Sequence, residues 1–154
     1  MPLGLIQVLS GTAGAVCFSM LFNIRGKRLL VSSVGGFLSW SFYLFFEYFL
    51  GNEVLSYFIV AALITAYAEI MARVVKAPTT TFIMAALVPL IPGASLYYTM
   101  TSAFSGNFEL FGTKAVYTFE LAAALALGVI VASAVSKAVF SATKKIRWHS
   151  QRNQ

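Results

Sequence analysis

The stretch Val88–Tyr98, with the sequence VPLIPGASLYY, places two prolines and a glycine inside an apolar run long enough to cross a bilayer. A proline lacks a backbone N–H and clashes with the carbonyl group four residues earlier. Pro89 should therefore release the carbonyl of Ala85 from helical pairing. Pro92 should release that of Val88 in the same way. Because lipid cannot hydrogen-bond to open backbone groups, the stretch predicts a helix break near mid-membrane that is enclosed by protein or lines a wet cavity.

The residues at this break have the chemistry to bind both ends of a small zwitterion. Pro92 suits the first position of a new helix, and the N–H groups that follow have no partner within that helix. A helix N-terminus carries a partial positive charge of about half a unit, and in secondary transporters such ends face anionic substrate groups. The released carbonyls could hold a cation or an ammonium group. The candidate substrate-binding residues are Pro89, Pro92, Gly93, Ala94, Ser95, Tyr97, Tyr98 and Thr99. The alternative is a purely structural kink.

The composition indicates an all-α, polytopic membrane protein that must position this break. Of 154 residues, 59% are hydrophobic and 10% are charged, and the mean hydropathy is +0.82. Five apolar segments each approach the ~20 residues that cross ~30 Å of hydrocarbon. These segments are Leu3–Phe22, Leu29–Leu50, Val54–Ala72, Thr79–Thr101 and Ala115–Ser136. We expect a single five-helix transmembrane domain over residues 1–143, with the fourth helix interrupted at Pro89, Pro92 and Gly93, and a basic tail over residues 144–154.

The basic residues predict how the spans are oriented. Lys and Arg accumulate on the cytoplasmic side of a membrane protein. With the N-terminus outside, the basic segments 23–28, 73–78 and 137–154 all face the cytoplasm, and only Lys114 of the eleven Lys and Arg residues stays outside. We therefore expect a multi-pass protein of the cytoplasmic (inner) membrane, in contact with membrane lipid, with its C-terminus in the cytoplasm. Trp148 and His149 are expected to be solvated or to lie against anionic headgroups.

Several classes of function are excluded or disfavoured by what the sequence lacks. A single cysteine, Cys17, excludes an intramolecular disulfide, and one histidine provides no cluster with metal-ligand spacing. There is no Ser/His/Asp constellation and no phosphate-binding loop, so we expect no enzyme, no metal and no cofactor. The basic residues lie in gaps between apolar runs rather than in a stripe, which argues against nucleic acid as a partner.

Carboxylates within the spans are candidates for coupling to a proton or a cation, because a buried charge in a membrane costs several kcal/mol. Glu120 lies about 9 Å into the fifth span from Lys114 at ~1.5 Å per residue. It is either a proton carrier or partner of a substrate ammonium group, or an interfacial side chain that reaches the outer surface. Glu69 is the second coupling candidate, but it also lies one turn before Arg73, a spacing that favours a simple ion pair. Glu47 is expected to snorkel at the outer boundary.

Small side chains recur every four residues along the fifth span and predict a close helix contact. Ala124, Gly128, Ala132 and Ser136 continue a row that begins at Glu120. Such rows let helix backbones approach closely, which matters in lipid because the hydrophobic effect no longer drives association. The partner helix is left open: it could come from this chain, from a second copy or from another subunit.

Three segments resemble the threonine/serine exporter family, specifically its C-terminal five-span half, which also occurs as a short separate protein of the YjjB type. APTTTFIMAALVPLIPGASLYYTM (Ala77–Met100) is similar to the signature region of the family. FSMLFNI (Phe18–Ile24), which contains Asn23, is similar to the segment that closes the first span. AEIMARVVKAP (Ala68–Pro78) is similar to the segment that leads into the fourth span and ends at Pro78.

The resemblance implies that the chain is a subunit of a secondary transporter that exports small carboxylate-bearing metabolites. These are threonine and serine for fused members of the family, and dicarboxylates such as succinate for a split pair. It also implies a second membrane subunit equivalent to the other half of the exporter, with self-association as the alternative. Relatives have Pro-Gly where this chain has Ala85-Ala86, which predicts a more regular half-helix before the break and leaves the substrate open. A non-transporting accessory subunit or a small channel is the alternative function.

Overall fold

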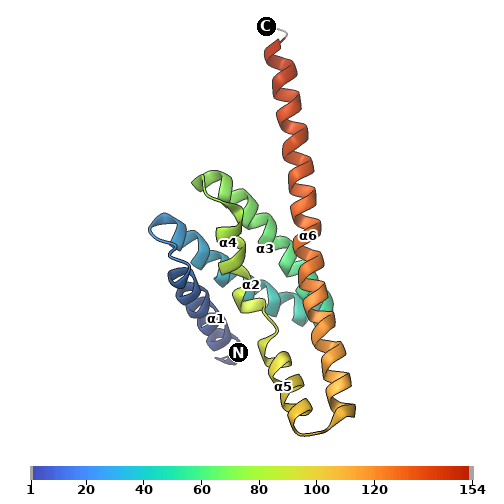
Figure 1. The fold of residues 1–154 in the computed structure, drawn as a ribbon. Coiled ribbons are helices and arrows are strands. Elements are labelled where there is room, and N and C mark those ends of the chain that lie inside the picture. Colours follow the sequence, from blue (N-terminus) through green and yellow to red (C-terminus); the bar gives the residue numbers. More distant parts are fainter. Residues whose placement is uncertain (1, 153–154) are drawn as a thin grey trace.

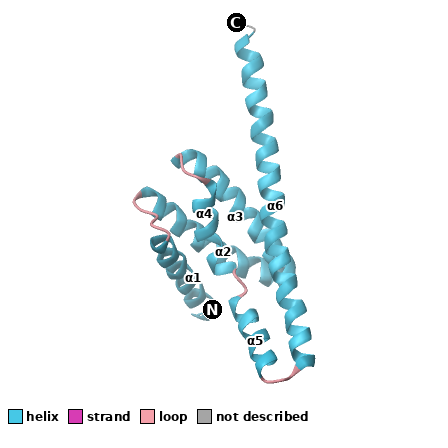
Figure 2. Cartoon of the chain, viewed as in Figure 1, coloured by secondary structure: helices cyan, strands magenta, loops and turns pink. Residues whose placement is uncertain are grey.

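The computed structural model describes the backbone of residues 2–152 and the side chains of residues 4–141, and within this part all regular structure is helical (Figures 1 and 2). The elements are α1 (Pro2–Leu21), α2 (Lys27–Leu50), α3 (Glu53–Val75), α4 (Thr79–Leu87), the 3-10 turn η1 (Val88–Leu90), α5 (Gly93–Phe104) and α6 (Phe108–Arg152). Four of these helices are long and apolar enough to cross a membrane, and α4 with α5 makes a fifth span when the bent pair is counted as one. The predicted all-α architecture with five spans is confirmed.

The loop between α2 and α3 is short because its residues end one helix and begin the next without a spacer. Gly51 ends α2 in the left-handed conformation (φ 60°), which glycine adopts without steric cost. The side chain of Asn52 then accepts a hydrogen bond of 3.1 Å from the backbone N–H of Leu55 and caps α3. This tight reversal places Glu53 at the first turn of α3, beside the end of α2.

The fourth span is interrupted where the two prolines predict it, and its halves meet at 57°. Two details of the prediction are wrong. The carbonyl of Val88 is not released, because the chain tightens into η1 and this carbonyl accepts a hydrogen bond of 3.2 Å from the N–H of Ile91. Pro92 is not the first helical residue, because it precedes α5, which begins at Gly93.

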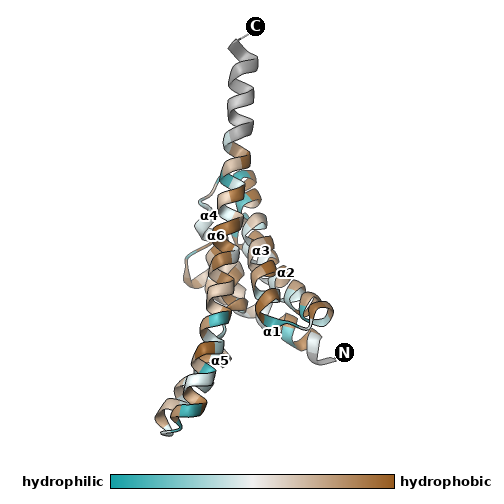
Figure 3. Cartoon of the chain, turned by 90° about the vertical axis from the view of Figure 1, so that its right-hand side faces the viewer, coloured by the Kyte–Doolittle hydropathy of each residue, from teal (hydrophilic) through white to brown (hydrophobic). Residues whose placement is uncertain are grey.

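The helices pack around α3, with α6 along one side of it and α2 and α4 along the other (Figure 1). α1 packs against α2, and α5 lies beside the first half of α6 as an antiparallel hairpin. The core between these helices is built around Val60, Ile64, Leu90 and Leu121. Apolar residues also cover much of the outer surface, as expected for helices that face lipid (Figure 3).

α6 is longer than the predicted span Ala115–Ser136, since it comprises 45 residues from Phe108 to Arg152. A hydropathy window detects only the apolar part of a helix, whereas the backbone continues until a residue interrupts it. No proline follows Pro92 in the sequence, so nothing stops the helix at the end of the apolar segment. The predictions for the side chains of the basic tail 144–154, including Trp148 and His149, lie outside the described residues.

The predicted row of small residues on α6 makes its close contact with α3 of the same chain. A Cβ atom built on Gly128 would lie 2.5 Å from the backbone oxygen of Phe58 and 2.8 Å from the Cβ of Ala61. Ala124 is buried in the same interface, and the hydroxyl of Ser136 donates a hydrogen bond of 3.4 Å to Glu69 on α3. The backbones of α3 and α6 therefore touch at a point where no side chain fits.

Replacing Gly128 by leucine should destabilise the protein by about 1–3 kcal/mol, because the new side chain meets backbone atoms of α3 that cannot move aside. The measurement is the thermal unfolding midpoint of the purified protein in a mild detergent. Gly112 is a matched control on the same helix, since a Cβ there would meet nothing within 4 Å. Equal midpoints for the Gly128→Leu and Gly112→Leu variants would contradict the close contact.

Candidate functional site

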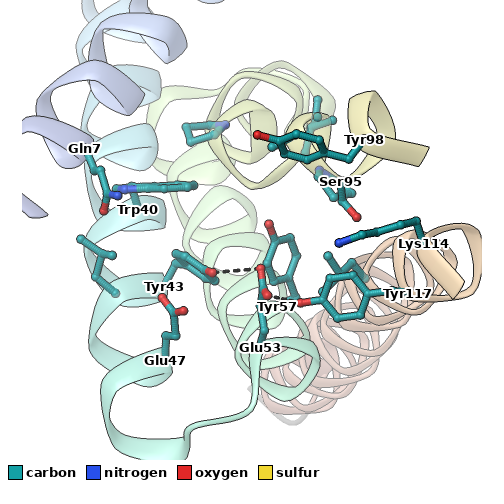
Figure 4. A pocket seen from close by; sticks show the side chains of 17 residues that line it. Gln7, Trp40, Tyr43, Glu47, Glu53, Tyr57, Ser95, Tyr98, Lys114 and Tyr117 are labelled. Carbon is teal, nitrogen blue, oxygen red and sulfur yellow. Dashed lines mark hydrogen bonds between the residues drawn. The ribbon is translucent and has the colours of Figure 1, made fainter. Parts of the chain in front are cut away.

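A cavity of about 560 Å³ lies beside the break of the fourth span, between α2, α3, α5 and α6 (Figure 4). Its volume falls within the range of about 300–1,000 Å³ that is typical of small-molecule sites. Six of the eight residues predicted to bind substrate line it: Pro89, Pro92, Gly93, Ala94, Ser95 and Tyr98. The break therefore opens onto a cavity that is lined by its own residues.

The other two predicted residues of this segment, Tyr97 and Thr99, do not line the cavity. Tyr97 lies on an outer face of α5 and is 66% exposed. Thr99 is buried, and its Oγ1 lies 2.9 Å from Oγ1 of Thr118 on α6. Consecutive residues of a helix point in different directions, so one ligand cannot contact all of Ser95, Tyr97, Tyr98 and Thr99. Thr99 instead helps to hold α5 against α6.

The first turn of α5 presents two free backbone amides at the cavity. The N–H of Gly93 donates to the carbonyl of Ile91 at 2.6 Å, so this donor is used within the break. The amides of Ala94 and Ser95 have no hydrogen-bond partner among the described residues. They lie at the positive end of the helix dipole, which favours an anionic group. The Oγ of Ser95, 2.7 Å from Oγ1 of Thr118, adds a hydroxyl at the same place.

A carboxylate and three tyrosines line the side of the cavity formed by α2, α3 and α6 (Figure 4). The hydroxyl of Tyr43 on α2 donates a hydrogen bond of 3.1 Å to Oε1 of Glu53. The hydroxyl of Tyr117 on α6 donates to Oε2 of the same carboxylate. Tyr57 packs edge-on against Tyr43 with ring centroids 5.2 Å apart. Glu53 thus links three helices, while Glu47 adds a second carboxylate to the lining.

Lys114 on α6 supplies the opposite charge. Figure 4 shows its side chain reaching into the cavity beside Ser95 and Tyr117. Within the described side chains its ammonium group forms no ion pair, because the one salt bridge found there joins Arg73 to Glu69. The cavity therefore has an unpaired cation and free amides on its α5–α6 side, and two carboxylates on its α2–α3 side. Charges of opposite sign within one cavity suit a small zwitterion.

The residues that supply these charges were not candidates in the sequence. Glu47 was expected to snorkel, Lys114 was expected only to lie outside the membrane, and Glu53 was not singled out. Their assembly depends on the packing of α2, α3 and α6, which no local pattern encodes. One signal in the sequence could have pointed to Glu53. The short connection of residues 51–53 (GNE) places this carboxylate directly at a helix start, in a chain that is otherwise poor in acidic residues.

The two carboxylates predicted to couple transport to a proton or a cation lie outside the cavity. Glu69 is buried near the other end of α3, where its Oε2 forms a salt bridge of 2.8 Å with Arg73. Arg73 also lies over the ring of Phe140 on α6, 3.5 Å from its centroid. Glu120 is exposed on α6. The ion-pair interpretation of Glu69 thus matches its contacts, and a coupling role for either residue stays a prediction.

The two remaining motif residues shape loops rather than the cavity. Asn23 follows α1 with a left-handed backbone (φ 57°), and its N–H donates to the carbonyl of Met20 at 2.9 Å. Pro78 directly precedes α4, where its carbonyl accepts from the N–H of Thr81 at 3.1 Å. Within the described residues, no group of three or more His, Cys, Asp or Glu side chains could hold a metal ion.

Comparison with known proteins identifies one family. The family model described as "Threonine/Serine exporter, ThrE" matches residues 7–135, which include every residue that lines the cavity. No match was found among curated proteins or among solved structures. The match covers most of the chain and includes the interrupted span and the helices around it. The chain therefore belongs to the threonine/serine exporter family.

Proposed function

We propose that this chain is a subunit of a secondary transporter that exports small carboxylate-bearing metabolites across the cytoplasmic membrane, with threonine and serine as its preferred substrates. The observation that carries the proposal is the cavity at the helix break, which is lined by Lys114 and by the two carboxylates Glu47 and Glu53. The family match supports the class of transport. The activity is movement of a solute rather than its chemical conversion.

The two charged ends of an amino acid match the two walls of the cavity. The α-carboxylate would pair with the ammonium group of Lys114 and accept hydrogen bonds from the amides of Ala94 and Ser95. The α-ammonium group would pair with Glu47, since the Glu53 carboxylate is already partly neutralised by hydrogen bonds from two tyrosines. Such a pose satisfies the groups that have no partner in the protein itself.

A dicarboxylate fits the same walls less well. One carboxylate of succinate would pair with Lys114, but the second would then approach the side of the cavity that carries Glu47 and Glu53. Like charges at close range inside a partly desolvated site repel strongly. The charges of the cavity therefore favour a zwitterion over a dianion, which supports threonine and serine as substrates over succinate.

A second membrane subunit, equivalent to the other half of a fused exporter, is proposed to complete the transporter beside α5. This helix packs mainly against α6, and its other faces expose large apolar side chains, such as Tyr97 at 66% and Phe104 at 89%. Tyrosine is enriched at the membrane–water interfaces, and large exposed apolar patches mark sites of contact with a protein partner or the membrane. A second copy of this chain is the alternative occupant. In the proposed orientation, with the N-terminus outside, the Glu53 end of the bundle faces the exterior.

Transport of labelled amino acids tests the proposal directly. The affinity-purified protein, with whatever membrane subunit co-purifies in mild detergent, is reconstituted into liposomes loaded with unlabelled threonine. Uptake of labelled threonine by exchange should saturate, and external serine should compete at concentrations at which succinate does not. Stronger competition by succinate would contradict the zwitterion assignment. Absence of both exchange and threonine binding would instead favour the accessory-subunit alternative.

A further inference from the structure

One face of α2 continues from the cavity into the bundle and carries only small residues beyond it. Tyr43, which lines the cavity, is followed along this face by Ser39, then by Gly35 and Gly36, and finally by Ser32. The spacing of three and four residues keeps these positions on one side of the helix. All of them are buried. Small residues let membrane helices pack closely, but two of the positions on this face also carry buried hydroxyl groups.

The two serines on this face hold hydroxyls without a partner. Oγ of Ser32 and Oγ of Ser39 are buried and form no hydrogen bond within the described residues. Serines on other faces of the same helix behave differently: Ser33 donates to the carbonyl of Leu29, and Ser41 donates to the carbonyl of Phe37, each at 2.8 Å. A serine in this helix can therefore donate to the carbonyl one turn earlier, yet Ser32 and Ser39 on the buried face form no such hydrogen bond.

Two further buried polar atoms have no partner. One lies next to Ser39 in the sequence, and the other lies at a similar depth on α3. The indole N–H of Trp40, the next residue, is buried without a partner, and Trp40 lines the cavity. Oγ1 of Thr65 on α3 is the other such atom among the described side chains. Counted from the loop between α2 and α3, Ser39 and Thr65 both lie about 18 Å along their helices at ~1.5 Å per residue. Unsatisfied groups of this kind call for an explanation, because buried polar groups are almost always hydrogen-bonded.

The buried face is shut by small residues that press directly on α2. A Cβ on Gly36 would lie 2.2 Å from the Cβ of Ala15 on α1. A Cβ on Gly35 would lie 2.9 Å from the Cβ of Ala86 on α4. Beyond them, the hydroxyl of Tyr67 on α3 donates a hydrogen bond of 2.9 Å to the carbonyl of Val31, beside Ser32. The ring of Tyr67 also packs against this face, because its Cε1 would lie 3.1 Å from a Cβ on Gly35. Opening the face therefore requires α1, α4 and the Tyr67 ring to move outward.

We infer that the face of α2 formed by Ser39, Gly35, Gly36 and Ser32 is the inner half of the substrate path, closed in this structure and lined with water or substrate when α1, α4 and the Tyr67 ring move away. The inference rests on the proposed transport function, since it needs a solute that crosses the bundle. The unpaired hydroxyls of Ser32 and Ser39 would then hydrogen-bond to the ammonium and carboxylate groups of a passing amino acid. If close packing were the only role of positions 32 and 39, alanine would serve there as well as serine, without the cost of burying an unpaired hydroxyl group.

Thiol accessibility tests this path. In a Cys17→Ser background, which removes the chain's one cysteine, single cysteines replace Ser32 or Ser39. The reconstituted protein is treated with a membrane-impermeant methanethiosulfonate while threonine exchange proceeds, and the rate of modification is measured. Three controls are single cysteines at Ser33, at Ser41 and at Ala68, the last being fully buried against Phe82. A thiol must ionise in water to react, so reactivity reports a wet position.

Cysteines at 32 and 39 should react at least about tenfold faster than the three controls, since a thiol in an apolar environment stays protonated. Rates at 32 and 39 no faster than at position 68, with threonine exchange intact, would overturn the path and leave the transport function in place. Fast modification that saturating threonine does not slow would keep the path but contradict threonine as its solute. Modification at positions 33 and 41 as fast as at positions 32 and 39 would also overturn the path, because the reagent would then not distinguish the faces of α2.

A second variant separates transport from packing. Ser39→Ala removes an unpaired hydroxyl, so its thermal unfolding midpoint should not fall, yet threonine exchange should slow by about fivefold or more if the hydroxyl contacts the solute. Ser41→Ala is the matched control and should leave exchange unchanged. Unchanged exchange in both variants would overturn the assignment of Ser39 to the path.

Discussion

Replacing Lys114 by methionine should raise the concentration of threonine needed for half-maximal exchange by about ten- to a hundredfold. A hydrogen bond to a charged group contributes about 1.5–3 kcal/mol, and every 1.4 kcal/mol corresponds to a factor of ten in affinity. Lys114 is the unpaired cation found in the cavity, so no other described side chain there can take over the substrate carboxylate. The measurement is the concentration dependence of labelled threonine exchange in proteoliposomes.

Two further variants define what the Lys114 result means. Lys114→Arg keeps the charge and should lose much less affinity than the methionine variant, although its guanidinium group has a different shape. Lys76→Met removes a cation near the other end of α3, away from the cavity, and should leave the half-maximal concentration unchanged. Similar affinity losses in the Lys76 and Lys114 variants would show that the effect comes from overall charge rather than from a contact with substrate.

Changing Pro92 and Gly93 together to leucine should reduce threonine export about a hundredfold or more while the protein still inserts and remains assembled. Leucine is a strong helix former, so the pair would let η1 continue into α5 and would reduce the 57° bend. The amides of Ala94 and Ser95 would then be taken up by the helix instead of facing the cavity. A loss on this scale corresponds to about 2.7–4 kcal/mol, the magnitude found when one preorganised hydrogen-bond donor is removed from an enzyme site.

Gly93→Ala alone is the control for this double variant. A Cβ at Gly93 would meet nothing within 4 Å, and the residue lies in a helical first turn, so alanine should preserve both the break and export. Export is measured in cells that depend on threonine efflux, and assembly is measured by size-exclusion chromatography in detergent. Normal export by the Pro92→Leu, Gly93→Leu protein would show that the break is only structural.

The parts of the fold that could be predicted from the sequence are those encoded within one segment. Hydropathy locates each span, because a helix needs about twenty predominantly apolar residues to cross the hydrocarbon. Pro89 and Pro92 locate the break, because the missing donors act on their own helix. The hydrogen bond that closes η1 could not be foreseen, since the chain adjusts its local geometry to satisfy a carbonyl that an ideal helix would leave free.

The parts that could not be predicted depend on which helix faces which. Glu53 accepts hydrogen bonds from the hydroxyls of Tyr43 and Tyr117. These two tyrosines are far apart in the chain and meet only after α2 and α6 pack on α3. Glu120 was a candidate because it lies deep in an apolar segment. Depth does not show which side of α6 a residue occupies, however, and Glu120 lies on an exposed side of the helix. One sequence therefore predicts where each span lies, but it does not predict which neighbouring helix or surface a given side chain faces.

The hydroxyl contacts of Thr118 have a mechanical consequence for the interrupted span. Thr118 bonds to both Ser95 and Thr99, which attaches the second half of that span to α6, while the first half packs between α2 and α3. The two halves are thus fastened to different neighbours and share only the short connection around η1 and Pro92. A change in the angle between the two halves would be absorbed by the backbone angles of those few residues, so the connection around the two prolines can act as a hinge.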